Sequence, residues 1–337
     1  MDYSSVMKRA WEITRRTPAL WALGAISAAQ AMVYSLVLTM MLVPITVLPQ
    51  VSTSLSLVAK GTESGIDPFG GVAQRLLVTG SQRLLEYLPA IISIVVCVFA
   101  IWVVLGVLDV AAQPAMITVS IARIEGRPVT AQQALRGGFA LWWRTAGLLA
   151  VAALPSLLIV LGIGVSTLFT YTLPLMRGQM PDPAAGVTTQ IAFTPLQVAA
   201  STVSVVLSVV VTIALRHALV EGAKLREALG RSWRLVKTNL ASVALTYLAA
   251  TIVAVLVAIV LALATALVGG VGAALVVGGA VIATGSFGAA AWIAGVVVTV
   301  LALAVGLVFQ AALYAWTSTV WTIAWRNLRF RSVSAET

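Results

Sequence analysis

The sequence has 337 residues, of which 60% are hydrophobic and only 9% are charged. Soluble domains carry roughly 25% charged residues, so this composition excludes an ordinary soluble protein and predicts a membrane protein. The formal net charge is +10. The single cysteine, Cys97, excludes a disulfide framework and a thiolate metal site, and within its apolar run we expect it to be a small buried side chain.

We expect an all-α, polytopic membrane protein with six transmembrane helices. A span needs about 20 apolar residues, and six stretches reach that length: roughly 19–43, 90–120, 146–170, 196–219, 240–268 and 290–325. The first is too long for the core of a signal peptide, so it is expected to be retained. The second and the last are over-long, and each is expected to project beyond the lipid as a continuous helix or to tilt strongly.

Two further segments flank these spans. In 71–89, one helical face is formed by small and apolar residues, which predicts an outer-surface amphipathic helix before Pro89: Ala73, Leu77, Gly80, Leu84 and Leu88. The segment 271–283, between glycine pairs, is too short to cross the bilayer, and we expect it to be re-entrant or interfacial.

The distribution of basic residues predicts the orientation, because Lys and Arg accumulate in short cytoplasmic loops. Seventeen of the 21 Lys and Arg residues lie in the N-terminal segment, the second loop, the fourth loop and the C-terminal tail. Six spans with both termini in the cytoplasm of a cell fit this distribution. The positive charge is therefore expected to report topology, and no nucleic-acid partner is expected.

Three related stretches predict an internal repeat: AWEITRRTPALWALGAI (10–26), GFALWWRTAGLLAVAAL (138–154) and SWRLVKTNLASVALTYL (232–248). Trp11, Phe139 and Trp233 align, and the second and third copies share an upstream Glu-Gly pair, at 125–126 and 221–222. We expect one membrane domain over 1–337 with hairpin units of approximately 1–121, 122–217 and 218–331, and a short polar tail over 332–337. Each unit is expected to begin with a cytoplasmic interfacial helix followed by two spans.

The third copy has the 3.6-residue pattern of an amphipathic helix. Its predicted apolar face comprises Leu225, Leu229, Trp233, Val236 and Leu240, and its polar face Lys224, Glu227, Arg231 and Arg234. Such a helix is expected to lie among the lipid headgroups.

Polar residues are expected to cap these helices. The stretch TAQQ (130–133) has the spacing of a capping box. Thr17, Thr145 and Asn239 each precede an apolar run, so we expect them to be the N-caps of the spans that follow.

A resemblance covers roughly residues 110–250, and the N-terminal copy weakly. The stretch LVEGAKLREALGRSWRLVKTNL, preceded by IALRHA, resembles the membrane domain that accompanies some glycerophosphodiester phosphodiesterases, and related stand-alone uncharacterised multi-pass bacterial and archaeal membrane proteins. The resemblance implies a helical membrane module. The catalytic domain of such fusions is absent from this sequence, so no phosphodiesterase activity is expected.

Few polar residues fall within the spans. Asp109 is a costly acid in an apolar segment, one turn before Gln113, and such residues are functional candidates by default. We expect Asp109 to pair with Arg216 or with His217, the only histidine, with Gln113 and Gln310 nearby. The pair would serve either as a structural clamp or as part of a solute or proton path.

No catalytic constellation or metal-ligand cluster is recognisable, so we expect neither enzymatic activity nor a cofactor. The predicted function is a membrane scaffold or accessory module that engages anionic lipid, a protein partner or another copy through its basic inner face. The docking residues expected there are Lys224, Arg226, Arg231, Trp233, Arg234 and Lys237. The alternative is a small transporter or lipid-handling carrier with Asp109 in its path.

Overall fold

The computed structural model describes residues 2–37, 70–167, 183–265 and 289–334, together with Phe169 and Leu173. All regular structure within these ranges is helical. The segment 271–283 lies outside the described residues, as do the end of the expected first span, 38–43, and the last residues of the tail, 335–337.

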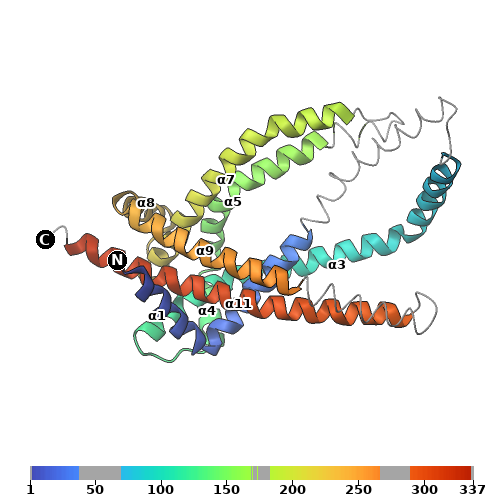
Figure 1. The fold of residues 1–337 in the computed structure, drawn as a ribbon. Coiled ribbons are helices and arrows are strands. Elements are labelled where there is room, and N and C mark those ends of the chain that lie inside the picture. The colour runs from blue at the N-terminus through green and yellow to red at the C-terminus, as the bar shows by residue number, and fades with distance from the viewer. Residues whose placement is uncertain are drawn as a thin grey trace. The chain divides into compact units, whose positions relative to one another are not determined.

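The described residues contain six helical segments that are long and apolar enough to cross a membrane: Pro18–Val37, Ser93–Ile124, Trp142–Ser166, Ala192–Val220, Leu240–Ala264 and Val296–Phe330. The chain is therefore a multi-pass helical membrane protein, as its composition predicts. The long helices that carry the last five segments are α3 (Gly70–Ile124), α5 (Trp142–Thr167), α7 (Pro183–Val220), α9 (Leu240–Thr265) and α11 (Ala289–Ser334) (Figure 1).

Helices α3 and α11 are much longer than a span, with 55 and 46 residues. Their length agrees with the expectation that the second and last apolar stretches are over-long. In α3 the helix runs without a break through Pro89, where we expected an outer-surface helix to end. The expected outer helix and the second span are thus one continuous helix.

Three short helices each precede a long one: α1 (Tyr3–Arg15), α4 (Ala131–Ala140) and α8 (Leu225–Thr238). Helix α1 begins at Asp2, whose side chain accepts from the backbone N–H groups of Ser4 and Ser5. Helix α4 begins with the predicted capping box, in which Thr130 and Gln133 bond each other's backbone N–H groups. A capping box satisfies two donors that the first helical turn leaves unpaired.

The three residues that we expected to be N-caps of the spans do not accept hydrogen bonds from the N–H groups of the helices that follow. Thr145 lies inside α5, because the break between α4 and α5 comes earlier, at Leu141. Thr17 and Asn239 do lie at breaks, but the Thr17 hydroxyl donates to the Ile13 carbonyl at 2.7 Å, and the Asn239 amide donates to the Leu235 carbonyl at 3.3 Å. These two side chains bond the carbonyl end of the preceding helix instead of the N–H groups of the next one.

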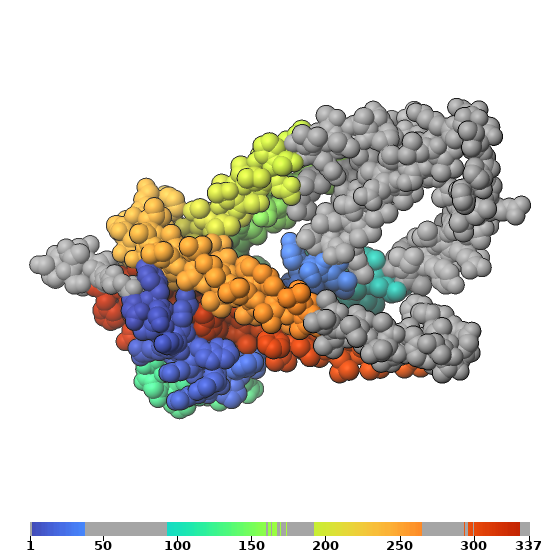
Figure 2. Space-filling model, in the orientation of Figure 1, coloured from blue at the N-terminus to red at the C-terminus, as the bar shows by residue number. Residues whose placement is uncertain are grey.

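The residues form two compact units. Unit 1 comprises 1–32, 105–149 and 208–337, and unit 2 comprises 33–104 and 150–207. In unit 1, α1 packs on α11 through Val6 and Ala10, which contact a buried cluster of Trp316, Val320 and Ile323. Figure 2 shows α1 (blue) lying on the red surface of α11. The N-terminal and C-terminal helices thus share one core.

Helix α8 also packs within unit 1, with a face different from the predicted one. Its buried residues are Ala228, Ser232, Leu235 and Val236, and Leu235 and Val236 contact Trp321 and Trp325 of α11. Of the predicted apolar face, Val236 is buried and Leu229 is half-buried, whereas Leu225, Trp233 and Leu240 are exposed. The apolar residues of α8 therefore divide between the protein core and an open surface.

Small residues allow two close approaches in unit 1. A Cβ atom at Gly138 of α4 would overlap the carbonyl oxygen of Ala111 in α3, and one at Gly24 would overlap the carbonyl of Ala311 in α11. Close backbone contact through small residues is common where membrane helices pack. These glycines fix how near the neighbouring helices can come.

The spans expose large apolar side chains, for example Leu158, Leu161 and Val260, each more than 60% exposed. Such continuous apolar exposure is expected where lipid covers the protein. Cys97 is also exposed, on α3, so the expectation that it is buried among protein side chains is wrong. It lies in a candidate span, where the apolar environment is lipid instead of protein core.

Candidate functional site

Two Glu-Gly turns connect a long helix to a short one. Helix α3 ends at Ile124 before Glu125 and Gly126, and α7 ends at Val220 before Glu221 and Gly222. Gly126 and Gly222 have φ angles of 74° and 66°. Residues with a side chain rarely adopt such values, and glycines in this conformation commonly end helices. Each glycine allows the chain to turn between the two helices, and the turn fixes the position of the preceding glutamate.

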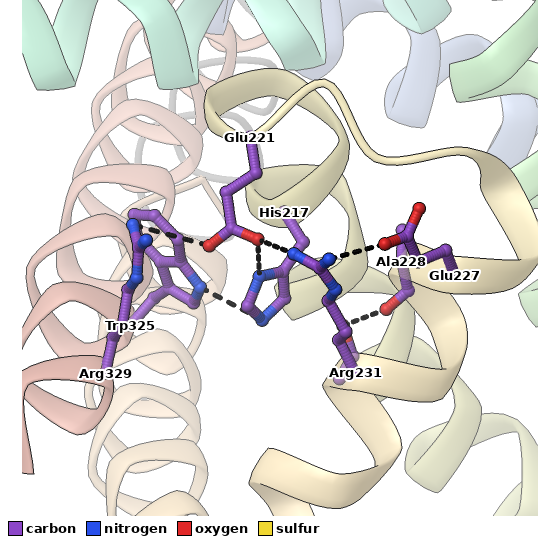
Figure 3. Close-up of polar contacts among 8 residues, drawn as sticks. His217, Glu221, Glu227, Ala228, Arg231, Trp325 and Arg329 are labelled. Carbon is purple, nitrogen blue, oxygen red and sulfur yellow. Dashed lines mark hydrogen bonds and ion pairs between the residues drawn. The ribbon is translucent and has the colours of Figure 1, made fainter. Parts of the chain in front are cut away.

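Glu221 is the centre of an ion-pair cluster. Its Oε2 atom lies 3.1 Å from Nδ1 of His217 and 2.7 Å from a guanidinium nitrogen of Arg231, and its Oε1 atom lies 3.3 Å from Arg329. The Glu221 side chain is only 13% exposed. Figure 3 shows how α7, α8 and α11 each contribute a residue around this one carboxylate.

The surroundings of Glu221 favour its ionised form. Burial raises the pKa of the Glu221 carboxyl, but the hydrogen bonds from His217 and Arg231 outweigh burial, so its pKa lies below the ordinary value. In return, the hydrogen bond to Glu221 and the nearby Glu227 carboxylate raise the pKa of Arg231. Each charge thus stabilises the ionised form of the other.

His217 links the cluster to the core. The indole Nε1 of Trp325 donates to Nε2 of His217 at 3.4 Å, and the two rings meet edge to face with centroids 5.5 Å apart. Because Nε2 accepts this bond, the proton of a neutral His217 resides on Nδ1, which faces Glu221. The histidine is oriented on both sides, and this arrangement is typical of a structural junction.

The corresponding glutamate in the other turn is arranged differently. Glu125 pairs only locally, with Arg127, and both side chains are well exposed. Exposed pairs between neighbouring residues contribute little to stability. Of the two turns, only the one after α7 ties three helices together.

The expected pairing of Asp109 does not occur. The amide Nε2 of Gln113 donates to Asp109 at 3.0 Å, whereas Arg216 donates to the backbone carbonyls of Thr212 and Ser318. No ion pair in the described ranges joins Asp109 to Arg216 or to His217. The prediction fails because both basic residues have other partners. Arg216 donates to the two backbone carbonyls, and His217 contacts Glu221.

The remaining member of the expected cluster, Gln310, is half-buried on α11, and its Oε1 atom is buried without a hydrogen-bond partner among the described residues. Two members of the expected cluster, Gln113 and Arg216, do lie close to a common space. Both line one cavity of about 210 Å³ within unit 1.

The expected docking residues lie on the surface of α8 and at its start. Lys224, Arg226, Arg234 and Lys237 are exposed, and Trp233 is 44% exposed with the Lys237 ammonium 5.4 Å from its ring centroid. Arg231 is different, because it is held by Glu221 and Glu227. It belongs to the ion-pair cluster, and its charge is already paired.

Sequence reasoning missed Glu221, Trp325 and Arg329 as members of a common site. The Glu-Gly pair was visible as a repeat feature, but Arg329 is 108 residues from Glu221 and its nearness follows only from the packing of α7 on α11. In the described ranges, no three histidine, cysteine or carboxylate side chains gather closely enough to hold a metal ion. The chain matches no family model, no curated protein and no solved structure.

Proposed function

We propose that this multi-pass membrane protein is a non-enzymatic module that binds anionic lipid of the cytoplasmic leaflet through the exposed faces of α1, α4 and α8. The observation that carries the proposal is the shared exposure of three aromatic side chains, one on each short helix. Trp11 is 45% exposed, Phe139 is 43% exposed and Trp233 is 44% exposed.

Basic residues accompany each of these aromatic side chains. Lys8 and Arg15 are exposed on α1, Arg136 on α4 and Arg234 on α8. Aromatic rings beside Lys and Arg are characteristic of the membrane interface, where the ring enters the headgroup layer and the cation meets lipid phosphate. The exposed Leu225 and Leu240 near Trp233 would extend the apolar contact.

The finer architecture belongs to the same proposal. In it, three hairpin units of one orientation each begin with an interfacial helix, and both termini are cytoplasmic. Support comes from the order of the helices, with α1, α4 and α8 each followed within a few residues by a long helix, and from the recurrence of the Glu-Gly turn. The resemblance to the phosphodiesterase-associated membrane domain receives no support from the comparisons and is not part of the proposal.

The test uses the three basic residues of α8 that have no carboxylate partner among the described residues. Arg226→Gln, Arg234→Gln and Lys237→Gln are combined, and Arg231 is left intact because it stabilises the turn. The matched control carries the same loss of three charges on the expected outer side, through Lys60→Gln, Arg75→Gln and Arg177→Gln. Native mass spectrometry then counts the phosphatidylglycerol molecules retained from a mixture with phosphatidylcholine.

Each basic residue near an anionic surface contributes about 1 kcal/mol, so the α8 variant should lose up to about 100-fold in preference for phosphatidylglycerol, and less at high salt. The control should retain the wild-type preference. Equal retention by both variants would contradict the proposal. A stoichiometric protein retained by wild type and lost from the α8 variant would show a partner-docking face instead.

A second candidate, a small carrier, is favoured by one observation. One oxygen of the Asp109 carboxylate, Oδ1, and the Oε1 atom of Gln310 are buried without a hydrogen-bond partner among the described residues. Unsatisfied polar groups within spans are typical of transport paths. Uptake into proteoliposomes that depends on Asp109, lost in Asp109→Asn at unchanged thermal stability, would establish the carrier.

A further inference from the structure

Arg216 is a buried cation whose contacts in the described ranges are all with uncharged groups. Arg216 is only 2% exposed. Its guanidinium donates to the backbone carbonyl of Thr212 and to that of Ser318 at 2.8 Å. Its Nε atom is buried and has no hydrogen-bond partner in the part of the chain that the structure describes. Among the residues that the structure describes, no carboxylate lies within ion-pairing distance of the guanidinium.

Such a charge is unfavourable without a counter-ion. A guanidinium remains protonated in proteins, and burying an uncompensated charge costs several kcal/mol even after relaxation. Carbonyl oxygens satisfy individual N–H groups but supply no net negative charge. The position of Arg216 near the end of a candidate span, Ala192–Val220, makes the absence of a counter-ion more costly still.

The Arg216 side chain lines a cavity in unit 1 of about 210 Å³. That space corresponds to about seven water molecules at roughly 30 Å³ each, and it is smaller than the pockets that hold drug-sized ligands. Other polar residues of the lining come from three further helices: Ser27 from Pro18–Val37, Gln113 from α3, and Tyr314, Thr317 and Ser318 from α11. The lining contains hydroxyl and amide groups and one cation, and no carboxylate.

We propose that this cavity binds a phosphate group, which supplies the counter-charge that Arg216 lacks. A guanidinium binds phosphate oxygens through two parallel N–H bonds, and hydroxyl groups add further donors. The hydrogen-bonding residues surround the cavity from four helices, and a tetrahedral phosphate presents acceptors in several directions where a planar carboxylate presents them in one plane. The phosphate belongs either to a lipid headgroup or to a free small anion.

Asp109 does not line the cavity. Its carboxylate accepts a hydrogen bond from Gln113, which is a lining residue. A ligand with a phosphate alone gains nothing from Asp109, whereas a zwitterionic ligand would use it. Asp109→Asn should therefore leave phosphate binding unchanged or make it tighter.

The first experiment needs no variant. Delipidated wild-type protein in detergent is titrated with sodium phosphate, and with sodium chloride at matched ionic strength, while its thermal unfolding is followed. Phosphate should raise Tm in a saturable way and chloride should not. In parallel, native mass spectrometry of protein extracted gently from a membrane containing phosphatidylglycerol reports tightly retained lipid.

Two variants assign the binding to the cavity. Arg216→Lys keeps the charge but loses the two-pronged geometry, and we expect affinity to fall by about tenfold. Arg123→Lys, at an exposed position near the end of α3, is the matched control. Thr317→Val preserves shape and removes one hydroxyl, so it provides a second variant if Arg216→Lys fails to fold.

A saturable phosphate effect that weakens in Arg216→Lys or Thr317→Val supports the cavity with a free anion as its ligand. One phosphatidylglycerol per chain, retained when Arg226, Arg234 and Lys237 are neutralised but lost in Arg216→Lys, supports it with a headgroup as the ligand. The latter result would hold even if the proposed lipid-binding face failed its own test. If neither probe binds, or if both cavity variants bind like wild type, the proposal is overturned, and loss of binding in Asp109→Asn would overturn the choice of phosphate.

Discussion

At the scale of single residues, Glu221 shows how one carboxylate can organise three helices. Its carboxylate contacts His217 near the end of α7, Arg231 of α8 and Arg329 of α11. Hydrogen bonds to charged groups contribute about 1.5–3 kcal/mol each where they are shielded from water. Because Arg231 and Arg329 are well exposed, their contacts contribute little, and the shielded contact with His217 matters most.

Replacing Glu221 by Gln should lower the free energy of unfolding by about 1–3 kcal/mol, because His217 and Arg231 lose their common acceptor charge. Thermal unfolding in detergent measures the effect. The matched control is Glu125→Gln at the equivalent turn, where the exposed pair with Arg127 predicts little change. Equal Tm values for the two variants would rule out a special role for the turn after α7.

The same residue predicts a pH dependence. The folded pKa of Glu221 lies below its ordinary value near 4.5, so its stabilising contribution is fully present above the unfolded pKa and is lost as pH falls through the folded pKa. In that acidic window, the Tm of wild type should fall more steeply than that of Glu221→Gln. Parallel Tm curves for the two proteins below pH 4.5 would contradict the pKa shift.

The residue scale is also where the sequence was least informative. A lone acid, histidine or arginine does not reveal its partner, and Asp109 was paired with the wrong cations because α7 places Arg216 against the backbone carbonyl of Ser318. The hydrogen-bond geometry of buried polar groups depends on helix rotation, which hydropathy does not encode. The exposure of Lys224 and Arg234 followed more directly from the amphipathic pattern, which puts both on the polar face.

At the scale of helices, the contact between α4 and α3 depends on one glycine. Gly138→Ala would place a methyl group against the carbonyl of Ala111, and overpacking of this kind costs typically about 1–3 kcal/mol. Gly137→Ala is an internal control, since a Cβ there meets nothing within 4 Å and alanine favours the helix. The order of Tm values should be Gly137→Ala at or above wild type, and Gly138→Ala below both.

If Gly138→Ala were as stable as Gly137→Ala, α4 would not be held against α3 in solution. A Leu141 or Trp142 substitution would not distinguish these cases as well, because Trp142 also donates to the Val107 carbonyl at 3.0 Å. The two adjacent glycines are a matched pair, because only the Cβ at position 138 would meet α3.

Helix existence was predicted well and helix boundaries less so. The six apolar stretches and the capping box at Thr130 are confirmed, because length, composition and a local hydrogen-bond pattern decide them. The entry to α5 was misplaced by four residues, and the predicted stop at Pro89 does not occur. Both errors concern junctions, where packing of the neighbouring helix decides whether one more turn is stable.

At the scale of the whole molecule, six crossings would place the two ends of the chain on the same side of the membrane, as proposed above. Single-cysteine reporters test this in a Cys97→Ser background: Ser5→Cys, Gln179→Cys and Ser334→Cys, labelled with a membrane-impermeant maleimide. We expect Ser5→Cys and Ser334→Cys to react only from the cytoplasmic face, and Gln179→Cys only from the opposite face.

Labelling of the Ser5 and Ser334 reporters from opposite faces would show an odd number of crossings. That result would make 271–283 a spanning segment and would place the basic C-terminal residues outside. The proposed lipid-binding face would then lose α11 as its neighbour on the cytoplasmic side.

The packing of α1 on α11 has a consequence for biogenesis. The hydroxyls of Thr14 and Thr319 meet at 3.5 Å across 305 residues of chain, and synthesis at about 5–20 residues per second separates their emergence from the ribosome by on the order of 15–60 s. During that interval α11 has not yet been synthesised, so Val6 and Ala10 of α1 lack the residues that bury them. A stalled or truncated chain would keep the apolar face of α1 uncovered, and a quality-control protease that binds this face would distinguish unfinished molecules from completed ones.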